Sequence, residues 1–160
     1  MRVRADEHVS PSIVRMISGT ALSSAFEISS VYESNQRATP DEHWITAFAK
    51  DGGDAILSAD KDFFRKPHQV VAVDDTGLRV IYLPTRWANA PRHLQAAHIL
   101  MWWRRIEVSL AESKPREIWA VPWNVSEEGK LQRKKVDYGH YRKKLKKATR
   151  PSRRKVQRGG

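Results

Sequence analysis

Apolar positions in the first half of the chain fall into two kinds of segment. Short apolar or alternating runs predict strands at residues 2–6, 26–32, 54–58 and 78–83. Apolar residues at helical spacing predict helices beginning at Pro11 and at Pro40, with Ser10 and Thr39 as their expected caps, and a third helix after Pro67. Because strands and helices alternate with short connections, the predicted fold is an α/β three-layer sandwich with a mainly parallel sheet.

The second half of the chain adds a long helical stretch at residues 94–110. Helical spacing places Trp103 on its packed face and turns Trp102 toward a partner subunit or another protein, so a homodimer is one expectation. Residues 117–123 predict a last strand, and Pro122 favours an edge position for it. The expected sheet therefore has four or five strands.

Charge is distributed very unevenly along the chain. Residues 130–160 hold 14 Lys or Arg and one acidic residue, whereas the whole chain carries +11. We therefore expect a folded domain at residues 1–126 and a basic tail at 127–160, helical near 130–148 and disordered after Pro151. The tail favours binding to nucleic acid phosphates or to an acidic protein surface, and the lysines and arginines expected to bind nucleic acid are Lys143, Lys144, Lys146, Lys147, Arg153, Arg154 and Lys155.

Composition excludes several kinds of site. The chain has no cysteine, so a disulfide or a thiolate metal site is impossible and any metal must be held by carboxylates, histidine or water. No apolar run is long enough to cross a bilayer, and the first residues lack the apolar stretch of a signal peptide. We therefore expect a cytoplasmic protein with no membrane partner.

Acidic residues follow two of the predicted strands and begin one of the helices. Asp6 ends the first strand, Asp60 and Asp62 follow a later one, and Asp41 lies in a first helical turn. Ligands of open parallel sheets bind at the carboxyl ends of the strands, so the four side chains can meet in one cleft. Carboxylates this close repel one another, and a divalent cation relieves that repulsion. Taken singly, each aspartate can equally cap a helix or fix a turn.

Three short motifs occur in a characteristic order: Asp6-Glu7-His8-x-Ser10-Pro11, then Pro40-Asp41-Glu42-x-Trp44, then Ser58-Ala59-Asp60-Lys61-Asp62-Phe63. This order resembles the PIN-like domain family that includes VapC-type toxins, in a short and divergent form that covers about residues 2–125. The joint order of the motifs, more than any one of them, carries the resemblance.

The resemblance implies that Asp6, Asp41, Asp60 and Asp62 are catalytic residues that surround Mg²⁺ or Mn²⁺. It also implies hydrolysis of RNA that leaves 5′-phosphate and 3′-hydroxyl ends, in a toxin-antitoxin system whose VapB-like antitoxin covers the cleft. Glu42 is a rival to Asp41, because many PIN domains use Glu at the helical position. Three further residues can support the site or contact substrate phosphate: His8, Lys61 and Arg65.

Two other functions fit the same sequence. In a non-catalytic nucleic-acid-binding module, the aspartates would only cap helices while the tail binds phosphates. A DNA-directed nuclease would use the same scaffold and metal. Chelation of the metal separates the first alternative from a nuclease, and matched RNA and DNA substrates separate the second.

Overall fold

A computed structural model describes residues 1–34, 39–126 and 128–150, and it contains one mixed sheet between layers of helices. The strands are β1 (Arg2–Ala5), β2 (Glu27–Ser30), β3 (Ala55–Ser58), β4 (Arg79–Tyr82), β5 (Ile118–Ala120) and β6 (Gln132–Lys134). The helices are α1 (Pro11–Thr20), α2 (Asp41–Lys50), the 3₁₀ turn η1 (Phe63–Arg65), α3 (Pro67–Thr76), α4 (Thr85–Ala88), α5 (Arg92–Glu112) and α6 (Tyr138–Thr149).

The sheet has the order β2-β1-β3-β4-β5-β6, and its first five strands are parallel. The α/β sandwich with a mainly parallel sheet is therefore confirmed. The order places β1 beside β3, with Ala5 paired to Leu57, so the residues that follow these two strands emerge next to each other. This adjacency brings the Asp6 and Asp60 segments to one edge of the sheet.

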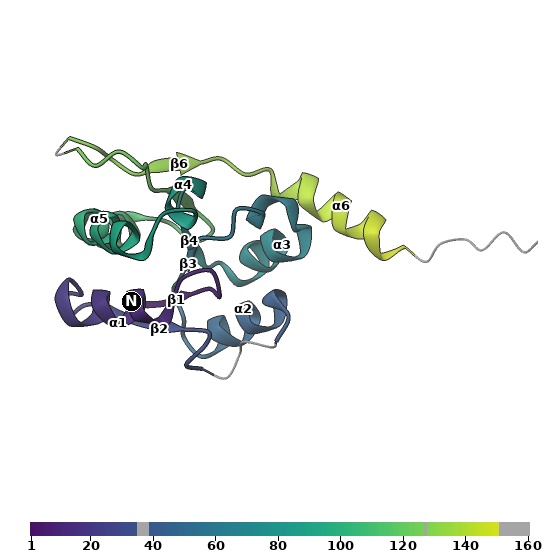
Figure 1. The fold of residues 1–160 in the computed structure, drawn as a ribbon. Helices are drawn as coiled ribbons and strands as arrows, with labels where there is room; N and C mark the ends of the chain where they lie inside the picture. Colours follow the sequence, from purple (N-terminus) through teal and green to yellow (C-terminus); the bar gives the residue numbers. More distant parts are fainter. Residues whose placement is uncertain (35–38, 127, 151–160) are drawn as a thin grey trace, which may run out of the picture.

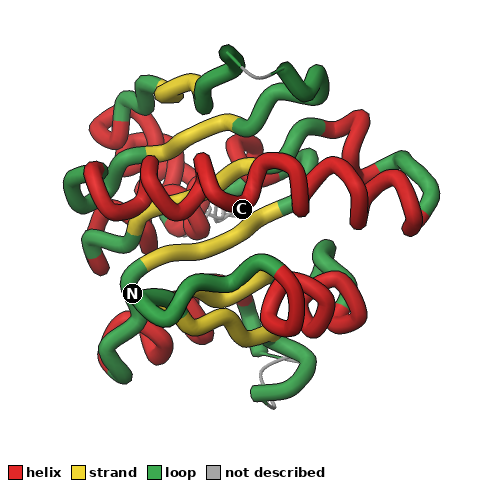
Figure 2. The backbone as a smooth tube through the Cα atoms, turned by 90° about the vertical axis from the view of Figure 1, so that its left-hand side faces the viewer, coloured by secondary structure: helices red, strands yellow, loops and turns green. Residues whose placement is uncertain are grey.

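Alternation along the strands divides the core into two halves. Leu57 and Ile81 face one side, where they pack with α1 and α5. Ile56 and Val80 face the other side, where they pack with α2 and α3. Figure 1 shows these two helical layers on either side of the strands, and Figure 2 shows the long α5 in front of the sheet.

Two helix starts test the predicted capping residues. Ser10 accepts a hydrogen bond from the backbone N–H of Ser12 and caps α1, as expected. At α2, Pro40 stands at the cap position without a side-chain hydrogen bond, so the expectation that Thr39 caps this helix was wrong. The acids Asp41 and Glu42 in the first turn of α2 instead interact favourably with the helix dipole.

The position expected for β5 was also wrong, because β5 is not an edge strand. It ends at Ala120, so Pro122 lies beyond it and removes no hydrogen bond from the sheet. The antiparallel β6 pairs with its outer side, with Ile118 opposite Lys134, and raises the strand number to six. A further correction concerns Trp102, which is as fully buried as Trp103 and therefore faces no partner.

The helix expected at residues 130–148 is confirmed only from Tyr138 onward, as α6, which packs on α3. The expectation was wrong for the residues before it, because Gln132–Lys134 pair with β5 as β6. Arg142 donates to Asp74 Oδ2 at 2.6 and 3.0 Å and also pairs with Asp75. Tyr138 donates from its hydroxyl to the Arg116 carbonyl at 2.6 Å. Arg153, Arg154, Lys155 and the disorder expected after Pro151 lie outside the described residues. The division into a domain and a tail at residue 127 remains a prediction.

Candidate active site

Two buried carboxylates, those of Asp6 and Asp60, lie at the carboxyl ends of neighbouring parallel strands. Their exposed fractions are 6% and 3%. The buried hydroxyl of Ser58 donates to Asp6 Oδ2 and accepts a hydrogen bond from the Asp60 backbone N–H at 3.2 Å. One side chain therefore links the two acids at the edge of the sheet where ligands of such folds bind.

Basic groups lie against the Asp60 carboxylate. Lys66 Nζ is 2.8 Å from Asp60 Oδ2, and His8 Nε2 is 3.8 Å from the same oxygen. His8 also lies 3.7 Å from the carboxylate of Glu7, while its backbone N–H donates to Asp6 Oδ1 at 3.0 Å. This edge of the sheet thus holds basic side chains as well as acids.

The two partners of the Lys66–Asp60 ion pair shift each other's ionisation. Burial alone would raise the pKa of Asp60, but hydrogen bonds from Lys66 and from the Asp62 backbone lower it on balance, so the carboxylate is ionised at neutral pH. Burial would lower the pKa of Lys66, yet its hydrogen bond to Asp60 and the charges of Asp60, Asp41 and Glu7 raise it. Lys66 is therefore the cation that several of the acids share.

Asp6 behaves in the opposite way, because it is buried without a directly bound cation. Burial raises the pKa of Asp6 from its ordinary 3.8 to about 6, against the opposing effects of the Ser58 hydrogen bond and the His8 charge. At neutral pH the ionised Asp6 carboxylate is thus an incompletely compensated buried charge. A cation in the cleft would stabilise it.

This ionisation predicts a pH dependence of the metal-free protein. A carboxyl group whose pKa is higher in the folded than in the unfolded state binds more protons when the protein is folded. The contribution of Asp6 to the free energy of unfolding therefore falls as pH rises from about 4 to about 6. The full loss of stability is about 3 kcal/mol, since each pKa unit corresponds to about 1.4 kcal/mol. Urea unfolding in EDTA between pH 4 and pH 7 should show wild type losing this much stability relative to Asp6→Asn. Parallel profiles for the two proteins would contradict the assignment.

Asp41 occupies the first turn of α2 and is held by two neighbouring side chains. Trp44 donates from its indole nitrogen to Asp41 Oδ1 at 3.0 Å, and the Gln69 amide of α3 donates to Asp41 Oδ2. The other amide atom, Gln69 Oε1, is buried and has no hydrogen-bond partner among the described residues. The charge of Asp41 also contributes to the raised pKa of Lys66, so Asp41 lies within electrostatic reach of the Lys66–Asp60 ion pair.

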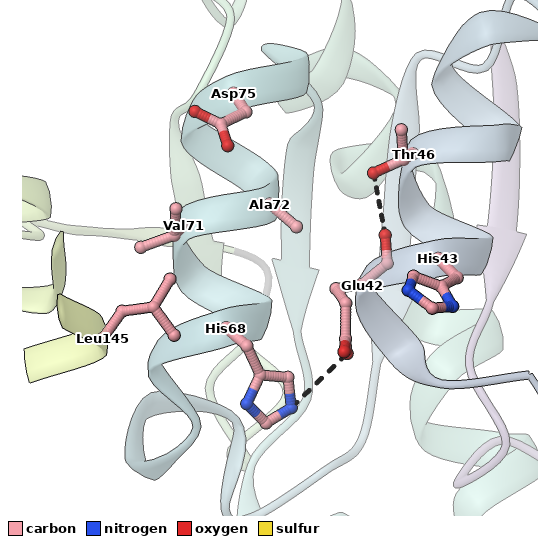
Figure 3. Close-up of a pocket in the computed structure, with 8 residues that line it drawn as sticks. All are labelled: Glu42, His43, Thr46, His68, Val71, Ala72, Asp75 and Leu145. Atoms are coloured by element: carbon pink, nitrogen blue, oxygen red, sulfur yellow. Dashed lines mark hydrogen bonds and ion pairs between the residues drawn. The ribbon is translucent and has the colours of Figure 1, made fainter. Parts of the chain in front are cut away.

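Glu42, the alternative to Asp41, faces a different part of the surface. Its carboxylate lies 3.7 Å from His68 Nε2. Both residues line a hollow of about 330 Å³ between α2 and α3, which Leu145 of α6 also lines (Figure 3). The geometry therefore favours Asp41 over Glu42 as the helical acid of the cleft.

The remaining candidates lie at the rim. Asp62 is 43% exposed at its side chain and lies 3.6 Å from Arg65, whose side chain is 84% exposed. Lys61 is exposed, and its carbonyl accepts a hydrogen bond from Tyr82 at 3.4 Å. Asp62 Oδ atoms are thus directed to a solvated ion pair, whereas the Asp62 backbone N–H donates to Asp60 Oδ1 at 2.9 Å.

The donor chemistry of the cleft fits a magnesium ion. No group of three or more His, Cys, Asp or Glu side chains in the described residues is arranged as a metal site. Mg²⁺ nevertheless needs only one or two protein carboxylates, because water and substrate phosphate complete its shell. Asp6, with its incompletely compensated charge, and Asp60 would supply two buried carboxylate ligands, and the unpartnered Gln69 Oε1 is a further hard oxygen beside Asp41.

Three residues of the cleft escaped sequence analysis as site residues: Ser58, Lys66 and Gln69. Ser58 stands in the motif before Asp60, but a serine there carries no signal for a bridging hydroxyl. Lys66 is one of 29 basic residues, and nothing in its spacing separates it from the others. Gln69 meets Asp41 only because α3 packs beside α2.

A family model described as a PIN like domain matches residues 1–85, just over half of the 160-residue chain. The matched part runs from β1 to the end of β4 and contains Asp6, Asp41, Asp60 and Asp62. No curated protein and no solved structure matches the chain significantly. In the described residues, no helix combines the length and the apolar character needed to span a membrane.

Proposed function

The chain belongs to the PIN-like domain family, whose members are generally nucleases, and from this premise we propose that it is a Mg²⁺-dependent endoribonuclease. One observation above all supports the proposal. Asp6 and Asp60 are buried side by side at the carboxyl ends of β1 and β3, within the part of the chain that matches the family. Burying two carboxylates together is unfavourable unless a cation or a proton compensates them.

Asp6 and Asp60 would hold the metal, and Asp41 would face it from α2. Bound Mg²⁺ would supply a water of lowered pKa for attack on the phosphodiester and would offset charge on the leaving oxygen. Ser58 would hold the Asp6 carboxylate against the backbone of Asp60 through its hydrogen bonds. Lys66 and His8, both close to Asp60, would bind and orient the substrate phosphate.

The basic α6 would supply RNA affinity outside the cleft. Its face toward α3 contains Tyr138, Tyr141, Arg142 and Leu145, which leaves Lys143, Lys144, Lys146 and Lys147 exposed. Leu145 also lines the hollow next to Glu42 and His68 (Figure 3). The chain neighbours of these two residues, Asp41 and Gln69, are hydrogen-bonded to each other. An RNA strand leaving the acids over this hollow would therefore reach a fixed row of cations.

The specific form of this proposal is a VapC-type toxin. The order of the three motifs supports it, and a VapB-like antitoxin that covers the acidic cleft would be the natural regulator. Lys66 already gives a pattern for such inhibition, because a cationic side chain in contact with Asp60 competes with a metal for the same oxygen.

A cleavage assay tests the function directly. With about 5 mM Mg²⁺ or Mn²⁺, the full chain should cleave single-stranded RNA. EDTA should abolish cleavage, and added metal should restore it. The products should carry 5′-phosphate ends, which a phosphatase-dependent labelling assay detects.

Two outcomes would replace the proposal. RNA binding that persists in EDTA without any cleavage in either metal would favour the non-catalytic binding module. Cleavage of a matched DNA strand but not of the RNA would favour a DNA-directed nuclease on the same site.

A further inference from the structure

Three aromatic rings lie beside the acidic cleft, and neither the metal nor the tail accounts for them. Phe63 and Phe64 belong to η1, and Tyr82 ends β4. Phe64 makes edge contacts with both neighbours, at centroid distances of 5.2 Å to Phe63 and 5.1 Å to Tyr82. Phe63 is 2% exposed and anchors the group in the core, whereas Phe64 and Tyr82 are only partly buried. The outer two rings therefore reach the surface on a rigid base.

A flexible cation covers the outer side of this aromatic pair. Lys134 of β6 places Nζ 3.7 Å from the Phe64 ring centroid and 5.6 Å from that of Tyr82. Lys134 is itself exposed, so the ring face beneath it is accessible once the lysine side chain rotates away. Such an arrangement resembles a stacking site whose resident cation can move to a neighbouring anion.

The pair adjoins the cleft at close range. The Tyr82 hydroxyl donates to the Lys61 carbonyl at 3.4 Å, between Asp60 and Asp62 in the chain. The charges of Asp60, Asp62 and Asp6, after burial, raise the pKa of Tyr82, which shows that its hydroxyl lies within electrostatic reach of all three acids. A phosphate at Asp6 and Asp60 would therefore have the Phe64–Tyr82 pair nearby, on the side of Lys61.

We propose that Phe64, Tyr82 and Lys134 form a base-stacking subsite that takes an unpaired nucleobase of RNA next to the phosphate bound at the acids. The inference rests on the proposed ribonuclease function. The base would stack on Phe64 in place of the Lys134 ammonium group, which would then pair with the adjoining phosphate. Only an unstacked base can enter, so the subsite selects single-stranded RNA.

A double-mutant cycle that combines removal of the Phe64 ring with removal of one RNA base tests this assignment. Short unstructured oligoribonucleotides, each with one abasic position, are titrated by fluorescence anisotropy in EDTA, where no metal-dependent cleavage occurs. For wild type, one abasic position should weaken binding about 10- to 100-fold, the range expected for a stacked base. Phe64→Leu should bind intact RNA correspondingly weakly, and the same abasic position should then change its affinity less than about threefold.

The matched control is Phe26→Leu, the same substitution at a buried ring on the opposite face of the sheet. It should leave the sensitivity to the abasic position as in wild type, even where both variants melt at a lower temperature. Lys134→Gln changes an exposed residue and should leave the fold intact. It should weaken the binding of intact RNA and reduce the salt dependence of binding by about one phosphate contact.

The proposal would be overturned if the affinity losses caused by Phe64→Leu and by the abasic position simply multiplied, at every abasic position tested. Independent losses of this kind would mean that the ring and the base do not touch. This failure is distinct from failure of the proposed function. If the wild-type protein cleaves RNA with Mg²⁺ but the two affinity losses are independent, the proposed nuclease function stands and the proposed subsite is wrong. A wild-type chain that binds no RNA in any buffer overturns both.

Discussion

Asp60→Asn should lower the rate of RNA cleavage by about three orders of magnitude while the protein stays folded. The substitution preserves shape but removes the charge of a buried carboxylate that we propose as a metal ligand. A metal supplies several kcal/mol of stabilisation to the transition state, and each tenfold in rate corresponds to about 1.4 kcal/mol. The measurement is single-turnover cleavage at saturating RNA and Mg²⁺, so that weaker substrate binding does not enter.

Asp62→Asn is the matched control for this variant. The two aspartates are two residues apart, but Asp60 is buried against Lys66, whereas the Asp62 side chain is partly solvated beside Arg65. We expect Asp62→Asn to change the rate less than about tenfold. Equal losses for both variants would give Asp62 the metal-binding role that the motif order implies and would contradict the ranking drawn from burial. Undiminished cleavage by Asp60→Asn would remove the metal site from this cleft.

The sequence predicted the edge of the sheet at which the acids lie, but not which of them are neighbours. Strand-end placement follows from local pattern, because Asp6 directly follows an alternating segment and Asp60 follows the short apolar run at residues 55–59. Their adjacency depends on β1 and β3 being paired, and strand order is a property of the whole chain. The same is true of Asp41, whose first-turn position was predictable while its partner Gln69 comes from another helix.

β6 was missed because it carries no apolar alternation. Its residues are Gln132, Arg133 and Lys134, all exposed, and it joins the sheet through backbone pairing with β5. Position in the sheet, and not side-chain pattern, therefore made it a strand. β6 matters for the proposed stacking subsite, because it brings Lys134 to Phe64.

The burial of Trp102 could not be predicted from helical spacing alone. Spacing assigns one packed stripe to α5, but the chain after β5 folds back over the helix and covers a second one. Arg105 lies 3.7 Å over the Trp102 ring and donates to the Gly129 carbonyl at 2.9 Å. A side chain at Gly129 would meet Trp102 at 3.0 Å, so glycine permits this close approach. A helix that looks one-sided in sequence is thereby packed on two sides.

Neutralising the exposed lysines of α6 should weaken RNA binding and flatten its salt dependence. The variant replaces four of them with Gln: Lys143, Lys144, Lys146 and Lys147. Each phosphate neutralised on a single strand contributes about −0.7 to the logarithmic slope, so four contacts contribute about −3. Between 50 and 200 mM KCl, wild type should therefore lose up to about 50-fold more affinity than the variant, as filter binding in EDTA measures.

Substitution is a sharper test than removal of the C-terminal region, because β6 and α6 both contact the body of the protein. Deleting them would uncover β5 and α3, so an effect on folding could not be told from an effect on binding.

The control replaces four exposed cations outside α6 with Gln: Arg15, Lys50, Arg104 and Lys114. Both variants lower the net charge equally, so a general electrostatic effect would flatten both slopes alike. A flatter slope for the α6 variant alone would assign the phosphate contacts to this helix, while an unchanged rate at saturating RNA would separate them from the chemistry at Asp6 and Asp60. Should neither slope move, α6 serves a partner other than RNA, and its row of lysines would fit an acidic protein surface.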